Sequence, residues 1–217
     1  MAAERFVLWG SAGHAKVLAS LLRLRGAEVI ALFDNDPSAR SALPGVPLHT
    51  GVAGLDRWMK GCVDGTPVHA AIAIGGSRGR DRLSIKAVLE SRGLTLPSLV
   101  HPDASVCGTA AIGAGSQVLA HALVAADARI GDACIVNHRA SVDHECVIGN
   151  GVHVAPGATL CGCVTIDHGA MVGAGAVILP RLVIGADSVI GAGAVVTRDV
   201  PPGSTVVGNP GRVLQAY

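Results

Sequence analysis

The sequence predicts two domains of different architecture, an α/β domain over residues 1–99 and a parallel β-helix over residues 100–217. In the first part, short apolar segments alternate with amphipathic helical patterns. From residue 100 onward, an aliphatic residue recurs at every sixth position. The 217-residue chain is 50% hydrophobic with 29 glycines but only 2% aromatic, which favours a narrow, regular core of aliphatic side chains.

The α/β domain is predicted from three apolar strands and two helices. Strands are expected at residues 5–10, 28–34 and 69–76, each ending at glycines or a polar turn. Helices are expected from Gly13 to Gly26 and over residues 78–92, where leucine and valine recur at helical spacing. Alternation of strands and helices predicts a parallel sheet with right-handed crossovers, and therefore a small Rossmann-like domain.

The second half repeats a six-residue unit seventeen times without interruption. A period of six fits neither a helix nor an ordinary strand, and it is the period of a hexapeptide β-helix. Each rung needs one inward aliphatic residue, and each corner needs a residue that turns tightly, which favours glycine. At three hexads per coil, seventeen hexads make between five and six coils. The repeated positions are Val100, Val106, Ile112, Val118, Val124, Ile130, Val136, Val142, Ile148, Val154, Leu160, Ile166, Val172, Ile178, Ile184, Ile190 and Val196.

Charge and hydropathy exclude several classes of partner. The net charge is +1 and no basic run occurs, so neither nucleic acid nor an anionic membrane surface is an expected partner. No stretch approaches the roughly 18 consecutive apolar residues of a membrane-spanning helix. The first ten residues, MAAERFVLWG, lack the basic and apolar regions of a signal peptide, so we expect a cytoplasmic protein.

The six cysteines include no CxxC pair. In a chain without a secretion signal they are interpreted as small buried hydrophobic residues. Cys146 adjoins the motif described next and is the one cysteine that could act as an acetyl-accepting nucleophile, although its apolar context favours a structural role. The others are Cys62, Cys107, Cys134, Cys161 and Cys163.

The segment SVDHECVIG places His144 between two carboxylates, Asp143 and Glu145. A histidine has an unperturbed pKa near 6.5 and can accept a proton from an attacking amine or hydroxyl. A carboxylate on its far nitrogen fixes the tautomer and stabilises the imidazolium. The sequence alone does not decide whether Asp143 or Glu145 is the carboxylate that contacts the His144 ring. It also allows His144 to be a mere corner residue, since His138 and His168 occupy the same hexad position.

The loop from Gly10 to His14 joins a strand to a helix. Glycines there let a ligand approach the backbone, and a helix N-terminus favours phosphate. The motif is not the full G-x-G-x-x-G dinucleotide fingerprint, and a tight turn alone would explain it. Asp34 ends the next strand, where such folds often bind a ribose or base. Together these features suit a nucleotide-diphosphate sugar.

Further residues border this predicted crevice. Gly75 and Gly76 end the third strand. Lys16 and Arg80 could reach phosphates, although solvated surface charge is the favoured interpretation of both.

The chain resembles a known family over essentially its whole length. The hexads and the tail Val207–Arg212 resemble the hexapeptide acyltransferases, which are left-handed β-helices and trimers; glycine replaces the usual alanine of their closing G-x-P-A-K/R segment. The GxxGH loop, the AIG third strand and the HECVIG motif narrow the resemblance. These three motifs resemble those of the nucleotide-sugar N-acetyltransferases of the bacillosamine and perosamine pathways and of the related sialic-acid O-acetyltransferases.

The resemblance implies an acetyl-CoA-dependent N-acetyltransferase that acts, as a homotrimer and without a metal, on a UDP- or GDP-linked 4-amino-4,6-dideoxyhexose. It implies that His144 is the general base and that Glu145 raises its basicity. It also implies acetyl-CoA contacts by His153, a place for Asn137 beside the active site, an oxyanion contact from the Gly162 amide, and main-chain coenzyme contacts at Ala174 and Ala192. For the nucleotide-sugar, it implies the segments Ala12–Gly13–His14 and Asp34–Asn35.

The sequence allows four alternative functions. The first is O-acetylation of a sugar or sialic acid on the same scaffold, and the second is a trimer that binds nucleotide-sugars without chemistry. A zinc carbonic anhydrase is disfavoured because the His-x4-His pair of those β-helices is absent. A redox role is disfavoured by the incomplete dinucleotide fingerprint. The histidines that could serve as ligands in a zinc site are His121, His138, His144, His153 and His168.

Overall fold

The structure is a computed structural model that describes residues 3–61 and 67–214. It divides into two compact units, the first containing residues 1–74 and 84–97 and the second containing residues 75–83 and 98–217. Residues 75–83 therefore group with the β-helix, whereas the sequence analysis places them in the amino-terminal domain. Cys62 lies outside the described residues.

The first unit contains a four-stranded parallel sheet in the order β3-β2-β1-β4. Its central strand β1 carries a buried run, Phe6 to Trp9, and Trp9 stacks on Phe33 with ring centroids 5.9 Å apart. Most of the unit's aromatic side chains gather around this pair. The elements are β1 (Arg5–Trp9), α1 (Gly13–Leu24), β2 (Glu28–Asp34), β3 (Leu48–Thr50), α2 (Gly51–Gly61), β4 (Val68–Ile72) and α3 (Gly79–Glu90).

The expected elements are present, and two were missed. The third predicted strand ends at Ile72 rather than residue 76, because the chain turns there and Gly76 has a φ of +68°. The short strand β3 and helix α2 were not predicted. β3 is only three residues long and follows Pro47, while α2 has glycine at both ends, so neither carries a strong pattern.

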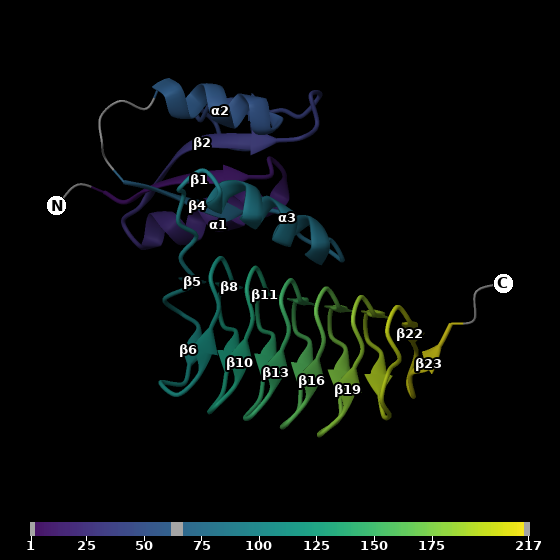
Figure 1. The fold of residues 1–217 in the computed structure, drawn as a ribbon. Coiled ribbons are helices and arrows are strands. Elements are labelled where there is room, and N and C mark those ends of the chain that lie inside the picture. Colours follow the sequence, from purple (N-terminus) through teal and green to yellow (C-terminus); the bar gives the residue numbers. More distant parts are fainter. Residues whose placement is uncertain (1–2, 62–66, 215–217) are drawn as a thin grey trace. The chain divides into compact units, whose positions relative to one another are not determined.

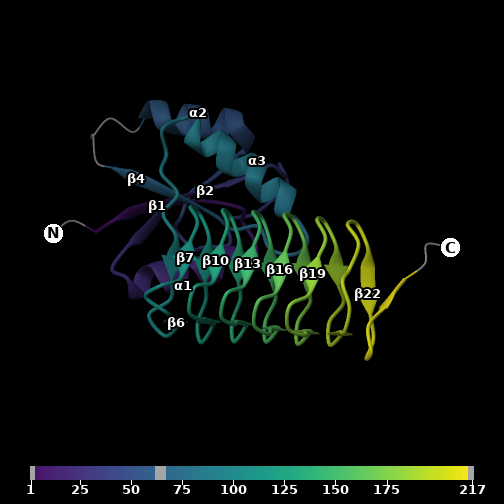
Figure 2. The same ribbon diagram turned by 60° about the horizontal axis from the view of Figure 1, so that its bottom comes forward.

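The second unit is a hexapeptide β-helix, as predicted. Its strands form three sheets of eight, six and five strands. Strands β5 to β21 have two residues each, run parallel, and each pairs with a strand eighteen residues away, while β22 and β23 end the sheet of eight. From β5 to β21 the second residue of each strand is the predicted hexad aliphatic, and from Val118 to Val196 these side chains are buried. Figure 1 shows the coils following one another in sequence order, and in Figure 2 β7, β10, β13, β16 and β19 lie side by side. A β22–β23 antiparallel pair follows the last coil.

The strands of this unit are β5 (Leu99–Val100), β6 (Ser105–Val106), β7 (Ala111–Ile112), β8 (Gln117–Val118), β9 (Leu123–Val124), β10 (Arg129–Ile130), β11 (Ile135–Val136), β12 (Ser141–Val142), β13 (Val147–Ile148), β14 (His153–Val154), β15 (Thr159–Leu160), β16 (Thr165–Ile166), β17 (Met171–Val172), β18 (Val177–Ile178), β19 (Val183–Ile184), β20 (Val189–Ile190), β21 (Val195–Val196), β22 (Thr205–Val207) and β23 (Arg212–Val213).

The corners of the coils share one backbone conformation. In most corners the third turn residue has a positive φ, and glycine often occupies it, as at Gly115, Gly157 and Gly175. At the corners between β12 and β13 and between β15 and β16, the residues in this position are Glu145 and Cys163, with φ of 58° and 61°. Residues with a Cβ are strained there.

No helix in residues 3–61 or 67–214 is long and apolar enough to cross a membrane.

Candidate active site

His144 and Glu145 lie on the turn that connects β12 to β13. The neighbouring hexad residues Val142 and Ile148 point into the core and are buried, so the turn itself faces outward. The side chains of His144 and Glu145 are 52% and 62% exposed. The His144–Glu145 pair is therefore held on a coil of the β-helix and remains open to solvent.

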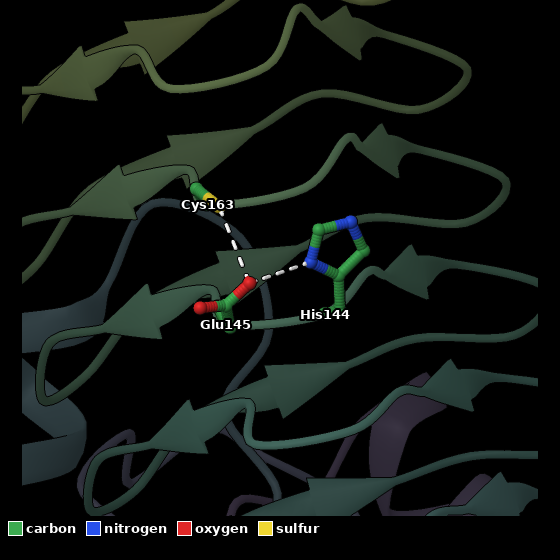
Figure 3. A group of neighbouring side chains, drawn as sticks. All are labelled: His144, Glu145 and Cys163. Atoms are coloured by element: carbon green, nitrogen blue, oxygen red, sulfur yellow. Dashed lines mark hydrogen bonds and ion pairs between the residues drawn. The ribbon is translucent and has the colours of Figure 1, made fainter.

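The imidazole of His144 contacts the carboxylate of Glu145 directly. Nδ1 of His144 lies 3.0 Å from Oε2 of Glu145. Because an ionised carboxylate only accepts hydrogen bonds, Nδ1 carries the hydrogen and Nε2 keeps its lone pair. Figure 3 shows Nε2 on the side of the ring away from Glu145. This is the arrangement required of a general base oriented by a carboxylate.

Cys163 adds a third group that the sequence analysis did not assign to the site. It lies one coil beyond Glu145, and its Sγ donates to Oε2 of Glu145 at 3.6 Å (Figure 3). The hydrogen bonds from His144 and then Cys163, with the charge of His144, hold the pKa of Glu145 below its ordinary value. Glu145 is therefore ionised and acts as the acceptor of both bonds.

Asp143 contacts the backbone of His144 and not its ring. Its Oδ1 accepts a hydrogen bond of 2.7 Å from the backbone N–H of His144. The question left open between the two carboxylates thus has a geometric answer, since Glu145 contacts the ring and Asp143 holds the peptide that carries it.

Gly162 lies beside the other end of the imidazole. It is buried, and a Cβ added to it would lie 2.5 Å from Nε2 of His144. Its position, eighteen residues after His144, stacks it on the same corner. Among the described residues, no acceptor receives a hydrogen bond from the Gly162 N–H. A backbone donor is therefore available next to the atom that would accept a proton.

His153 is buried, at 5% exposure, and both ring nitrogens contact protein groups of the second unit. Nδ1 lies 3.2 Å from the carbonyl of Gly76, and Nε2 lies 3.1 Å from Nδ2 of Asn137. Since Oδ1 of Asn137 accepts from the N–H of His138, its amide nitrogen must face the ring. These contacts assign the hydrogen to Nδ1 and make Nε2 an acceptor.

The Gly76 carbonyl is held in turn by Arg82. This guanidinium is only 1% exposed and donates to the carbonyls of Ala133 at 2.9 Å, Gly151 at 2.6 Å and Gly76 at 3.3 Å. Burial lowers the pKa of Arg82 to about 10. The structure therefore embeds His153 and Asn137 in a hydrogen-bonded network rather than on an open surface.

Ala174 and Ala192 occupy the same corner position on consecutive coils, and both are exposed. Within residues 3–61 and 67–214, neither backbone N–H donates to a protein acceptor. Gly173 keeps the coils in contact, because a Cβ there would lie 2.6 Å from the nitrogen of Ala192. Their predicted main-chain role with the coenzyme remains a prediction.

In the first unit, Asp34 ties two loops together. Its Oδ2 accepts from the N–H of Ser11 at 2.8 Å, and its Oδ1 accepts from the N–H of Asp36 at 3.0 Å. Gly10 is required at the preceding position, because it has a φ of +110° and a Cβ would lie 2.5 Å from the carbonyl of Ala73. The loop before α1 is thus fixed in place, and a ribose contact by Asp34 remains a prediction.

The remaining predicted substrate residues differ in what surrounds them. A Cβ on Gly13 or on Gly75 would meet nothing within 4 Å, and neither has a positive φ. Ala12 is the N-cap of α1 with an extended backbone and no side-chain cap. His14 follows on the first helical turn. Asn35 lies beside Asp34 and belongs to the first unit, as do Ala12–His14, whereas Gly75 belongs to the second.

Arg80 is not free to bind phosphate, because its exposed guanidinium forms a two-bond ion pair with Asp187.

The expectation that the cysteines are buried is correct for two and wrong for three. Cys134 and Cys146 are buried, and burial raises the pKa of each to about 11. Cys107, Cys161 and Cys163 are only half-buried, because they are the first or third residue of a turn, whereas the two buried cysteines are the fourth, which faces the core. Cys146 donates its thiol hydrogen to the carbonyl of Cys161 at 3.2 Å, consistent with a structural role.

Each of the two units matches a known protein family. Residues 5–87 match the family described as the PglD N-terminal domain, and residues 127–162 and 163–198 match the bacterial transferase hexapeptide family. A comparison with curated proteins found no match.

Several solved structures are similar over nearly the whole chain. The acetyltransferase domain of PglB from Neisseria gonorrhoeae FA1090, in complex with acetyl coenzyme A, is 32% identical with a TM-score of 0.86, over 98% of this chain and 100% of that one. PerB from Caulobacter crescentus, in complex with CoA and GDP-perosamine, is 36% identical with a TM-score of 0.87, over 99% of both chains. WeeI from Acinetobacter baumannii AYE is 29% identical with a TM-score of 0.86, over 98% of this chain and 100% of that one.

The fold and the matched repeats define the protein as a hexapeptide-repeat acyltransferase. More narrowly, the chain belongs to the sugar acetyltransferase family that combines this β-helix with a PglD-type amino-terminal domain.

Proposed function

We propose that the chain transfers the acetyl group of acetyl-CoA to the amine of a nucleotide-linked amino-dideoxy sugar, a UDP- or GDP-4-amino-4,6-dideoxyhexose. The observation that carries the proposal is the pair His144–Glu145, with Nδ1 bonded to the carboxylate and Nε2 beside the Gly162 backbone. The ligands of the relatives, acetyl coenzyme A in PglB and CoA with GDP-perosamine in PerB, support the choice of substrates.

In this proposal the sugar amine attacks the thioester carbonyl carbon directly. Nε2 of His144 accepts the proton that the amine loses, and Glu145 stabilises the imidazolium through Nδ1–H. The Gly162 N–H donates to the oxyanion of the tetrahedral intermediate. Collapse of that intermediate expels CoA thiolate, which takes the proton from His144. The products are the N-acetyl sugar and free CoA.

The two units have separate proposed tasks. The first unit binds the nucleotide portion through the loop of Ala12–His14 and through Asp34 and Asn35. The second unit, with Gly75, positions the sugar and binds the coenzyme through the network of His153 and Asn137 and the free N–H groups of Ala174 and Ala192. We also propose a homotrimer, as in the resembled family; light scattering after gel filtration tests the oligomeric state.

The test is CoA release from acetyl-CoA with a panel of UDP-, GDP- and dTDP-linked 4-amino-4,6-dideoxy sugars, their hydroxyl counterparts and free sialic acid. We expect turnover on one amino sugar, and a loss of about 10²–10⁴-fold in kcat for His144→Asn. Turnover only on a hydroxyl acceptor would replace the proposal with O-acetylation. No turnover, with nucleotide-sugar binding retained, would favour a binding protein instead.

A further inference from the structure

The three side chains that meet at the proposed base are also a set of metal ligands. His144, Glu145 and Cys163 each offer one donor atom, and these atoms lie within 4.8 Å of one another. Their chemistry is that of a zinc site, because imidazole nitrogen, thiolate and carboxylate are the three ligand types that Zn²⁺ binds in proteins.

The present distances are close to those of a tetrahedral site. Zn–N, Zn–O and Zn–S bonds of about 2.0–2.3 Å place nitrogen and oxygen about 3.4 Å apart, and oxygen and sulfur about 3.6 Å apart. In the structure these separations are 3.0 Å for Nδ1 to Oε2 and 3.6 Å for Oε2 to Sγ. Small side-chain rotations therefore suffice, and the half-exposed group is open to an ion from solvent.

We infer that His144, Glu145 and Cys163 bind a soft divalent cation such as Zn²⁺, and that this ion switches the general base off. The inference rests on the proposed role of His144. On binding, the Cys163 thiol releases its proton to solvent and the thiolate and Nδ1 of His144 bond to the metal. The hydrogen that was on Nδ1 then resides on Nε2. Nε2 no longer has a lone pair, so it cannot accept the substrate proton.

The charge balance suits this ion. Cys163 as thiolate and Glu145 as carboxylate carry two negative charges, so the zinc complex is neutral. The guanidinium of Arg181 lies on the coil after that of Cys163, and its positive charge acts on Glu145. It therefore meets no net repulsive charge. Water completes the fourth position.

Metal binding is tested by an absorption measurement that does not depend on enzyme activity. The full chain is titrated with Co²⁺, whose bond to a thiolate gives a charge-transfer absorption in the near ultraviolet, and Zn²⁺ is then added as competitor. We expect the band in wild type and in Cys161→Ser, a matched change at a half-buried corner cysteine two residues away. We expect it to be absent in Cys163→Ala, with zinc affinity lower by at least roughly 100-fold, since loss of an outer-shell partner alone costs 10–100-fold.

Inhibition is measured separately, as acetyl-CoA consumed at early times by chromatography, with each variant normalised to its own zinc-free rate. Zinc should inhibit wild type and Cys161→Ser, a chelator should restore the rate, and Cys163→Ala should resist. No cobalt band in wild type, or a band that persists in Cys163→Ala, would overturn the metal site. A band lost in Cys163→Ala without zinc inhibition would overturn the switch. Absence of turnover in every variant would instead count against the proposed function, and the cobalt result would stand by itself.

Discussion

Gly162 and His144 occupy equivalent corner positions on adjacent coils, and a single added carbon on Gly162 would lie 2.5 Å from Nε2 of His144. Glycine is therefore needed at this position to leave room for the imidazole. The turn itself does not need it, since Gly162 has no positive φ. Gly162→Ala should push the ring from its place and lower kcat by about 10²–10⁴-fold, the contribution of a positioned general base.

The chain supplies a matched control for that change. Gly108 occupies the same corner position three coils earlier, and a Cβ there meets nothing within 4 Å. Gly108→Ala should keep wild-type kcat. Equal losses in the two variants would show that the effect comes from the coil and not from the ring.

Glu145 combines a positive-φ backbone with the proposed role of its carboxylate beside His144. Glu145→Gly removes a side chain from a positive-φ position, which should stabilise the folded state by about 1–2 kcal/mol through relief of backbone strain. The added glycine also makes the unfolded chain more flexible, which should offset about 0.4–1 kcal/mol of that gain. We expect the free energy of unfolding to stay level or rise by up to about 1.6 kcal/mol. We expect kcat to fall at least about tenfold, within the roughly 10⁴-fold limit for an orienting carboxylate. Denaturant unfolding and steady-state kinetics measure the two effects, and a parallel fall in both would contradict the assignment.

The same carboxylate sets a pH dependence. The pKa of Glu145 is held below its ordinary value of 4.5, so the carboxylate is ionised at every pH above that value. The kcat advantage of wild type over Glu145→Gln should therefore be present at all pH above 4.5 and disappear as the pH falls through the lowered pKa. Rates of both forms across the acid range test this, and a loss of the advantage near neutral pH would argue against it.

Gly13 is a glycine that the first unit does not need for its own packing. It has no positive φ, and a Cβ would meet nothing within 4 Å. If the space is kept for a nucleotide-sugar, Gly13→Val should raise the KM for that substrate and leave the KM for acetyl-CoA and the unfolding midpoint unchanged. A rise in both KM values would show that the residue does not serve the nucleotide alone.

Two arginines near the start of α3 should differ sharply in their effect on stability. Arg82 is buried and donates to three carbonyls, one of which also contacts the ring of His153. Arg82→Leu therefore leaves two carbonyls without a donor and should cost about 2–6 kcal/mol, at about 1–3 kcal/mol for each buried unpaired group. Arg80 pairs with Asp187 while exposed, and Arg80→Gln should cost less than about 1 kcal/mol. Urea unfolding of both variants compares them directly.

The cysteines should react with iodoacetamide in an order set by their surroundings. Hydrogen bonds from Thr109 lower the pKa of Cys107, while burial raises the pKa of Cys134 and Cys146 to about 11. Because the thiolate is the reactive form, Cys107 should be labelled well before Cys134 and Cys146 at pH 8, and all should speed up as the pH rises. Peptide mapping by mass gives the order. Cys146→Ala should keep its turnover, as expected if no acyl-enzyme forms on that sulfur.

The sequence predicted the β-helix well because its signal is periodic and each rung needs the same inward residue. It missed β3 and α2, where three residues and a glycine-flanked helix leave no pattern to read. It predicted a carboxylate partner for His144 but did not distinguish Asp143 from Glu145. Only the geometry of the turn does so, because Glu145 contacts the ring and Asp143 accepts from the His144 backbone N–H. Cys163 was taken for a core residue, yet adding eighteen to 144 and 145 would have identified Gly162 and Cys163 as their neighbours.

The eighteen-residue offset between paired strands also limits how such a protein can change during evolution. Inserting one residue between positions 145 and 162 would move His144 away from Gly162 and turn every later aliphatic residue out of register. A length change that keeps the interior intact must add or remove a whole coil, or extend a corner outward as a loop. The proposed catalytic corner consequently depends on turns of two adjacent coils, residues 143–146 and 161–164. Point substitutions can change its side chains one at a time, whereas a change of register separates the two turns.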